Sequence, residues 1–476
     1  MDEELKRKTK TGVIWSAIQR FSTQGLQFLT TIVLANFLGP AEYGTVGMLA
    51  IFIAISSVFI DSGFINALTR KSDRTHEDIC TVFYFNIFIS IFAYAVLFLI
   101  APVVASFYEM PELCLVLRVI GISLIISSFS AVQATLLTIK LDFKNQTRIA
   151  IISLSLSAVL AIILAYKGFS YWALVVQEIA RCIISTCLYW YFSPWRPSRI
   201  FSIESFKELF GFGSKLLAST LIDTLYVNIY SLVIGKVFTP ATLGNYGRAE
   251  SYASFPSSSL TGVIQRVTYP VLCKMQGNDI ELGNAYRKFL RLSAFIIFPL
   301  MTGLSALAYP FIILLIGQKW IESAAMLQII CFGLMWYPIH AINLSLLLVK
   351  GRSDLSLKLE IIKKSVGITL LCISIPLGIM ALCYASIVSS IISLVVNTYY
   401  TGKLINYGFF SQLKDLLPTL FISLCMWGLI MFINSQIPCM LTEMAIGVPL
   451  GAVFYITASF FFNRVVINTI LSLIKK

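Results

Sequence analysis

Apolar runs of 18 or more residues recur along this chain from near its start almost to its end, and short clusters of turn-forming or charged residues separate them. Of the 476 residues, 58% are hydrophobic and only 12% are charged. A water-soluble protein of this length would need more polar surface than these residues supply. A run of about 20 apolar residues can span a bilayer as a helix. The sequence therefore predicts an all-α integral membrane protein.

Turn and charge clusters divide the apolar runs into about fourteen transmembrane helices. Several of these exceed the ~20 residues needed to span, so tilted, kinked or protruding helices are expected. The polar segments between them are too short to form a soluble domain. By residue number, the predicted spans are 11–38, 42–67, 79–107, 113–139, 147–166, 170–193, 207–237, 242–273, 284–316, 322–350, 354–378, 380–403, 413–436 and 441–463.

One tight turn occurs twice in the sequence, 200 residues apart. Residues 37–47 read FLGPAEYGTVG and residues 237–247 read VFTPATLGNYG, so a Pro-Ala pair and two glycines return in the same order. A second block returns at a shift of 210 residues: Leu117, Ile120, Leu136, Leu137 and Lys140 recur as Leu327, Ile330, Leu346, Leu347 and Lys350. Two homologous, pseudo-symmetric six-helix lobes would explain both repeats, and a chance coincidence of Pro and Gly in two outer turns is the alternative.

The repeat predicts four parts of the chain. These are an N-terminal six-helix lobe (1–193), a cytoplasmic linker (194–206), a C-terminal six-helix lobe (207–403) and two additional transmembrane helices (404–476). Six spans is an even number, so both lobes enter the membrane from the same side. Parallel repeats of this kind rock about a central cavity in alternating-access transporters. A transporter is therefore the predicted function class.

Lys and Arg are distributed unequally between the two predicted sides of the membrane. The N-terminal segment, the even-numbered connections and the C-terminal segment carry 24 of them, whereas the odd-numbered connections carry only Lys167, Lys236 and Lys319. Loops rich in Lys and Arg face the cytoplasm. Both termini of this multi-pass chain are therefore predicted to be cytoplasmic. The net charge of +13 is interpreted as a topology signal, and no nucleic acid is expected as a partner.

The sequence shows no motif for catalysis, for a cofactor or for a metal. It contains no G-x-x-x-x-G-K phosphate-binding loop, so ATP hydrolysis is not predicted. The 10 Cys are scattered through the helices without a C-x-x-C pair, which indicates neither a disulfide framework nor a metal site. We therefore expect no catalytic residue, no cofactor and no metal.

Charged and amide side chains concentrate in four predicted helices, the repeated pair of each lobe. A charge at the centre of a bilayer costs ~2.5–3.5 kcal/mol on insertion scales, so it usually faces a wet cavity or a partner. The candidate substrate-binding residues are Arg20, Gln24, Lys215, Arg248 and Arg266, and the candidate coupling-ion residues are Asp61 and Asp223. Positive residues dominate, and Arg matches phosphate in a bidentate manner. The predicted cavity therefore suits an anionic ligand.

Other interpretations of these charges stay open at this point. Arg20 could pair with Asp61, and Lys215 with Asp223, as structural ion pairs. Arg248 and Lys215 lie near the ends of their spans, so they could snorkel to the interface.

Two further polar features inside spans are interpreted as structural. Glu178 and Arg181 stand at i and i+3 on the sixth span and can neutralise each other. His340, beside Pro338, could titrate and carry protons. A hydrogen-bonded histidine in a kinked helix is the simpler interpretation.

The N-terminal sequence resembles that of a known transporter family. The residues that carry the resemblance are Gly12, Trp15, Leu38–Gly39–Pro40, Glu42–Tyr43–Gly44, Asp61–Ser62–Gly63–Phe64 and Ala67. Their K-x-G-x-x-W start and L-G-P-x-x-Y-G turn are similar to the Wzx-type polysaccharide transporter (oligosaccharide flippase) branch of the multidrug/oligosaccharidyl-lipid/polysaccharide (MOP) exporter superfamily. The resemblance is strong over residues 1–75 and looser but collinear across the remaining spans.

This resemblance implies two six-helix bundles in a V shape, often with two added helices. It implies a flippase of the bacterial inner (plasma) membrane that moves a polyprenyl-diphosphate-linked oligosaccharide to the outer leaflet for O-antigen, capsule or exopolysaccharide biosynthesis. The expected partners are this lipid-linked oligosaccharide, membrane lipids and, as a candidate, a polymerase. Related lipid II flippases are similar in using cavity arginines near the diphosphate, for which Arg20 and Arg266 are the candidates here. Asp61 or Asp223 would exchange a cation or proton to reset the lobes.

Two other functions are considered beside the flippase. A cation-coupled multidrug antiporter of the same superfamily typically takes cationic ligands, which fits a net-positive cavity poorly. A membrane enzyme acting on lipid-linked sugars would need clustered acids or large polar loops, and the sequence shows neither. We therefore expect that the chain is not an enzyme.

Overall fold

The computed structural model describes residues 3–61, 63–71, 73–464 and 466–468, and for residues 3–14, 17, 61, 212 and 215 it describes the backbone only. The regular secondary structure of these ranges is helical, and it includes no strand. Within the same ranges, 11 helices are long and apolar enough to cross a membrane. The predicted all-α membrane fold is therefore confirmed.

Each of the predicted spans coincides with a helix or with a helix broken into two. In the first half of the chain these are α1 (Glu3–Phe37), α2 (Pro40–Asp61), α3 (Phe64–Arg70), α4 (His76–Tyr108), α5 (Glu112–Ile120), α6 (Ile122–Ile139), α7 (Phe143–Tyr166), α8 (Trp172–Phe192) and α9 (Ile203–Val237). In the second half they are α10 (Pro240–Lys274), α11 (Asp279–Ala306), α12 (Ala308–Ile316), η1 (Gln318–Trp320), α13 (Ile321–Leu334), α14 (Tyr337–Val349), α15 (Ser353–Ser374), η2 (Ile375–Leu377), α16 (Ile379–Ile405), α17 (Phe409–Asn434) and α18 (Met440–Phe462).

The repeated turns connect two helical hairpins at the same register. α1 ends at Phe37 and α2 begins at Pro40, while α9 ends at Val237 and α10 begins at Pro240. Proline suits the first position of a helix, because the N–H that it lacks would have no partner there and its φ is already helical. The shift of 200 residues thus holds for the helix ends as well as for the sequence.

The second repeated block ends two further helices in the same way. The backbone N–H groups of Lys140 and Lys350 each donate to a carbonyl four residues earlier, at 3.0 Å. The next residue is left-handed in both places, with φ 57° at Leu141 and 70° at Gly351. The shift of 210 residues therefore extends to backbone conformation.

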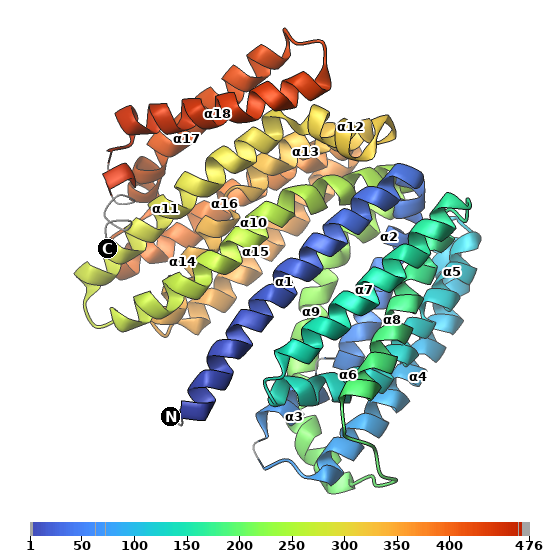
Figure 1. The fold of residues 1–476 in the computed structure, drawn as a ribbon. Helices are drawn as coiled ribbons and strands as arrows, with labels where there is room; N and C mark the ends of the chain where they lie inside the picture. Colours follow the sequence, from blue (N-terminus) through green and yellow to red (C-terminus); the bar gives the residue numbers. More distant parts are fainter. Residues whose placement is uncertain (1–2, 62, 72, 465, 469–476) are drawn as a thin grey trace. The chain divides into compact units, whose positions relative to one another are not determined.

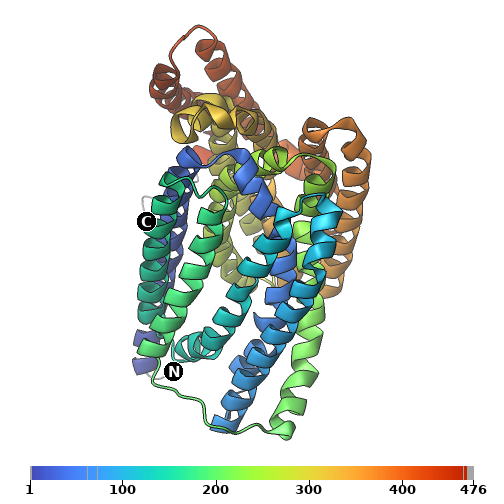
Figure 2. The ribbon, with the colours of Figure 1, turned by 90° about the vertical axis from the view of Figure 1, so that its right-hand side faces the viewer.

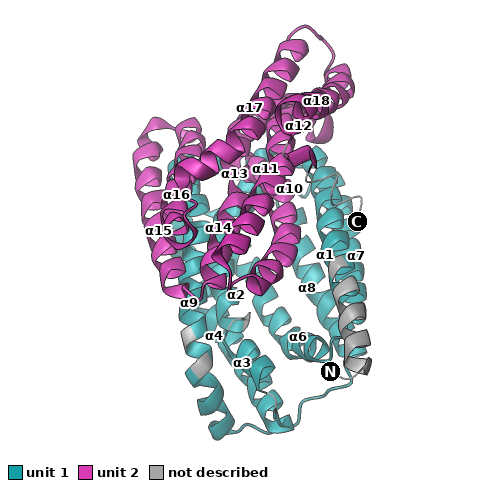
Figure 3. Ribbon diagram, turned by 90° about the vertical axis from the view of Figure 1, so that its left-hand side faces the viewer, with its two compact units in different colours: residues 1–244 teal, residues 245–476 magenta. Residues whose placement is uncertain are grey.

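The chain forms two compact units, residues 1–244 and residues 245–476, which Figure 3 shows in two colours. The boundary between the units falls within the first two turns of α10. The predicted lobes, by contrast, are defined by the sequence repeat, and their boundaries at residues 194–206 stay a prediction.

In unit 1, the helices run side by side along a common direction (Figures 1 and 2). α1 packs on α7 and α7 on α8, while α2 packs on α9 and α4 on α6. Buried apolar side chains of α3, α4, α6 and α9 form one cluster that includes Phe64, Leu68, Phe83, Leu136 and Leu209. Because α9 contributes to this cluster, it is part of the core of unit 1.

In unit 2, α11 packs on α17, α17 packs on α18, and α13 and α15 both pack on α16. Figure 1 shows α17 and α18 as an antiparallel pair. A buried polar network joins three elements of this unit: the Tyr286 hydroxyl donates to Asn343 Oδ1 at 2.8 Å, and the Gln412 amide donates to the same oxygen at 3.2 Å. These three side chains thereby satisfy one another's polar groups, which a membrane interior favours.

Candidate functional site

Two of the predicted substrate-binding residues of unit 1, Arg20 and Gln24, lie on one face of α1. Arg20 and Gln24 are one turn apart; the Arg20 side chain is exposed and the Gln24 side chain is half-buried within the unit. Among the described residues, no carboxylate lies within ion-pair distance of Arg20. The buried Gln24 Oε1 accepts no hydrogen bond from the described part of the chain. This face of α1 can therefore offer a cation and an amide to a ligand.

The predicted residues of unit 2 lie on α10. Arg266 is exposed and Arg248 is half-buried within the unit. They are eighteen residues apart, which is about five helical turns and ~27 Å along the axis, so they share one face of α10. A single headgroup cannot contact both side chains at once. Their predicted role in one binding site must therefore be divided between two positions.

The remaining predicted residues are placed less fully. Asp223 lies on α9 and is exposed within unit 1. The side chains of Asp61 and Lys215 lie outside the described residues, so the pairings proposed for them stay predictions. Arg20 belongs to unit 1 and Arg266 to unit 2, and their convergence on one ligand is likewise a prediction.

The two helices that carry Arg20 and Arg266 differ in composition from most of the others. Of the segments that match predicted spans, α1, α10 and α15 are not among the 11 described helices that are apolar enough to cross a membrane by themselves. Arg20 and Arg266 are exposed on two of these helices. Lipid chains cannot solvate such charges cheaply. The exposed faces of α1 and α10 are therefore expected to meet water or a polar ligand.

The Glu178–Arg181 pair and His340, which were interpreted as structural from the sequence, form the expected ion pair and hydrogen bonds. Arg181 Nε donates to Glu178 Oε2 at 2.9 Å, as the i, i+3 spacing predicts. His340 lies 3.0 Å from the Ser390 hydroxyl and 3.3 Å from the Asn397 amide. The expected i, i+3 ion pair and the expected hydrogen-bonded histidine are therefore both present, and a purely structural role for these groups stays a prediction.

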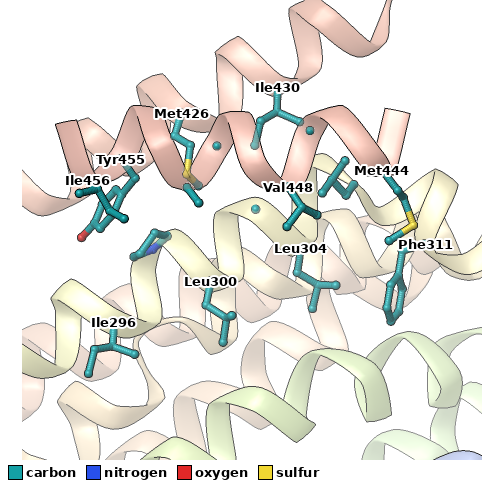
Figure 4. A pocket seen from close by; sticks show the side chains of 16 residues that line it. Ile296, Leu300, Leu304, Phe311, Met426, Ile430, Met444, Val448, Tyr455 and Ile456 are labelled. Atoms are coloured by element: carbon teal, nitrogen blue, oxygen red, sulfur yellow. The ribbon is translucent and has the colours of Figure 1, made fainter. Parts of the chain in front are cut away.

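Sequence reasoning missed an apolar groove in unit 2 (Figure 4). Its volume is about 510 Å³ and its walls come from α11, α12, α17 and α18, with Leu300, Leu304, Met426, Ile430 and Val448 among the lining residues. The G-x-x-x-G pair of α18, Gly447 and Gly451, permits close packing beside this groove, because a Cβ at position 451 would lie 2.8 Å from Ile430. The groove can hold a hydrocarbon chain.

Sequence reasoning also missed a basic pocket at the start of α11, which we define by its lining residues Asn284, Arg287, Lys288, Arg291, Leu292 and Val466. Its volume is about 230 Å³. Arg287, Lys288 and Arg291 are among the 24 Lys and Arg residues predicted to lie on the cytoplasmic side, and no site was predicted for them from the sequence. Together with the asparagine they stand at i, i+3, i+4 and i+7, a spacing that places them on one helix face and that could have indicated the pocket.

Comparisons with known proteins agree with this architecture. Residues 33–325 match the polysaccharide biosynthesis protein family. The chain is 24% identical to the teichuronic acid biosynthesis protein TuaB of Bacillus subtilis, over 95% of each chain. It is 26% identical to the lipopolysaccharide biosynthesis protein WzxC of Escherichia coli, over 75% of this chain and 73% of the relative. The lipid II flippase MurJ in an inward closed conformation shares the fold, with a TM-score of 0.75 at 16% identity, over 96% of this chain and all of the other.

Proposed function

Because this chain belongs to the polysaccharide biosynthesis protein family, we propose that it is a flippase that moves a polyprenyl-diphosphate-linked oligosaccharide across the membrane by alternating access. The observation that carries the proposal is the exposure of Arg20 and Arg266 on two of the least apolar helices of a multi-pass membrane protein. Exposed cationic forks on such helices suit a diphosphate, which Arg binds in a bidentate manner. The relatives named for polysaccharide biosynthesis and the fold shared with a lipid II flippase support the same substrate class.

The spacing along α10 suggests how the headgroup travels. Arg266 lies in the half of α10 predicted to be cytoplasmic, and Arg248 lies about five turns nearer the opposite end. The diphosphate would first contact Arg266 together with Arg20 and Gln24. It would then pass to Arg248 as the lobes rock, while the polyprenyl chain stays in lipid. With two separated arginines, a positive side chain can neutralise the diphosphate at both ends of a path that is too long for one side chain.

The finer parts of this proposal follow from charge and topology. The Lys and Arg distribution supports cytoplasmic termini, and we propose that the protein lies in the inner membrane of a bacterium. Asp223 and Asp61 are the proposed residues for a coupling cation or proton, and Lys215 is a further proposed contact for the diphosphate. A polymerase that uses the flipped lipid is the proposed partner. The protein would change the location of its substrate and none of its bonds, so it would not be an enzyme.

Reconstitution into vesicles tests the function directly. The purified chain is expected to move a fluorescent polyprenyl-diphosphate oligosaccharide between leaflets, and Arg20→Ala is expected to abolish this movement without loss of protein. Lys167→Ala removes an exposed cation of the same unit and serves as the matched control. Equal rates for Arg20→Ala and wild type would reject the role of Arg20. Export of cationic dyes without lipid movement would instead support the multidrug antiporter, and chemical change of the sugar would support an enzyme.

A further inference from the structure

The basic pocket defined above has a built geometry rather than being a loose group of surface charges. Asp415 of α17 is only 5% exposed and forms ion pairs with both Arg287 and Arg291. Arg287 also donates to Asp415 through Nη2 at 2.6 Å, and its guanidinium lies 5.5 Å from the ring centre of Tyr407. Tyr407 in turn donates its hydroxyl to Asp415. One buried carboxylate and one ring therefore fix the positions of two guanidinium groups.

The pocket keeps an excess of positive charge after this pairing. The pocket has three cations, Arg287, Lys288 and Arg291. Among the described residues, Asp415 is the only carboxylate that forms an ion pair with any of them. Lys288 is exposed and makes no ion pair with a described residue. Each guanidinium has five N–H donors, so both retain donors beyond those used by the carboxylate. An anion in the pocket would meet uncompensated charge and donors that are already in place.

The size and the donors of the pocket favour a phosphate group. Its volume of about 230 Å³ is below the range of pockets that hold drug-sized ligands, so an oligosaccharide would not fit. Arg forks match phosphate oxygens in pairs, and Lys binds phosphate as a point charge. The Asn284 amide adds a neutral donor at the rim.

The pocket and the apolar groove follow one another along the same helices. On α11, Ile296 of the groove comes five residues after Arg291 of the pocket, a rise of about 7.5 Å. On α17, Met426 of the groove comes eleven residues after Asp415, a rise of about 16 Å. A molecule with an anionic head and a long apolar tail could therefore place its head among the cations and its tail along the groove.

We propose that the basic pocket binds the phosphate of an anionic phospholipid from the leaflet on the predicted cytoplasmic side, with an acyl chain in the apolar groove. Basic pockets between transmembrane helices on the cytoplasmic side are typical sites for anionic lipid headgroups. The site lies wholly within unit 2 and includes none of the residues proposed to contact the substrate. It therefore goes beyond the flippase function and does not depend on it.

The test is native mass spectrometry of the full-length protein released from nanodiscs that contain phosphatidylcholine and cardiolipin in equal amounts. Wild-type protein is expected to retain cardiolipin preferentially. Lys288→Ala is expected to reduce this retention about five-fold, the effect of one basic residue near a charged headgroup. Lys288→Glu should reduce it further. Lys274→Ala removes an exposed cation of the same unit outside the pocket and should retain cardiolipin like wild type.

Thermal unfolding distinguishes the sources of the phosphate. Cardiolipin is expected to raise the melting temperature of wild-type protein and not that of Lys288→Glu. Inorganic phosphate at equal concentration should raise the melting temperature of neither protein. An equal rise with inorganic phosphate would overturn the assignment to a lipid, and a rise with polyprenyl phosphate alone would assign the pocket to the substrate. Equal cardiolipin retention by Lys288→Glu and wild type would overturn the site itself. Because Lys288 has no part in holding Asp415, these variants leave the fold of the pocket intact.

Discussion

Gly44 lies so close to Pro240 that a Cβ at position 44 would stand 1.7 Å from the proline carbonyl oxygen. The relationship is reciprocal, because a Cβ on Gly244 would stand 1.9 Å from the carbonyl oxygen of Pro40. The two repeated turns therefore meet backbone to backbone. Only glycine permits this approach, which explains why the P-x-x-x-G spacing returns in both copies of the turn.

Gly44→Ala is expected to lower the melting temperature of the purified protein in detergent. The added methyl group would force the two backbones apart, and overpacking of this kind costs about 1–3 kcal/mol. Gly47→Ala is the matched control one turn away, where a Cβ would meet a leucine methyl at the ordinary distance of 3.5 Å. If both variants have the same melting temperature as wild type, the close contact does not stabilise the fold.

Leu141→Gly is expected to stabilise the protein. Leu141 has a left-handed backbone (φ 57°) and is 36% exposed, whereas the repeat supplies glycine at the corresponding position, Gly351. A left-handed conformation costs roughly 1–2 kcal/mol for a residue with a Cβ, and glycine removes that cost. The reciprocal change Gly351→Leu should lower the melting temperature. A lower melting temperature for Leu141→Gly would mean that lost apolar contacts outweigh the relief of strain.

Lys71→Met is expected to destabilise unit 1 by about 1–3 kcal/mol, because a buried carboxylate loses a charged partner. Lys71 Nζ lies 2.8 Å from Glu208 Oε2 and 3.0 Å from Oδ2 of the buried Asp78. Lys207→Met, which removes an exposed cation of the neighbouring helix α9, should melt like wild type. A melting temperature for Lys71→Met equal to that of Lys207→Met would contradict this role.

The same ion pairs predict a flat pH dependence near neutrality. The hydrogen bonds that Lys71 donates to Glu208 and to Asp78 raise the pKa of Lys71 above its usual value. A raised pKa means that the stabilisation is fully present below the unfolded value of about 10.4 and is lost only as the pH rises through the folded value. The difference in melting temperature between Lys71→Met and wild type should therefore stay constant from about pH 6 to about pH 9. A difference that shrinks within that window would contradict the expectation.

A double-mutant cycle at Glu178 and Arg181 should show strong coupling. Arg181→Gln alone leaves a carboxylate within the span of α8, where lipid cannot solvate it. Adding Glu178→Gln should restore most of the lost stability, because two neutral amides replace the ion pair. Thermal unfolding of the two single variants and the double variant measures the coupling. Additive losses would indicate that the two side chains act independently.

Much of the fold could be predicted because it is encoded locally. Long apolar runs define the spans, and Pro40 and Pro240 mark helix starts by removing an N–H. The break between α5 and α6 at Gly121 was not predicted, since one glycine in an apolar run is also tolerated within a helix. The i, i+3 pair of Glu178 and Arg181 was predicted because both partners lie on one helix.

The candidate sites could be predicted only in part, because they depend on residues distant in the sequence. Arg287 was predicted only as one of the charges on the cytoplasmic side, and the sequence does not indicate that it pairs with Asp415, 128 residues further on. The apolar groove likewise needs α11 and α18 together. The residues proposed to contact the substrate were selected by the cost of charge in a membrane, a rule that identifies unusual side chains without showing which of them meet.

The low apolarity of α10 and α15 also bears on how the chain is made. A segment that partitions weakly into lipid is released poorly from the insertion machinery by itself, because each charged residue opposes transfer. Partners that are already inserted can shield those charges. Synthesis from the N-terminus would place α9 in the bilayer before α10. Stable insertion of α15 would require α16, which follows it in the chain and packs on it. Biogenesis of this protein is therefore expected to proceed by pairs of helices, with a weakly inserting member accompanied by a neighbour.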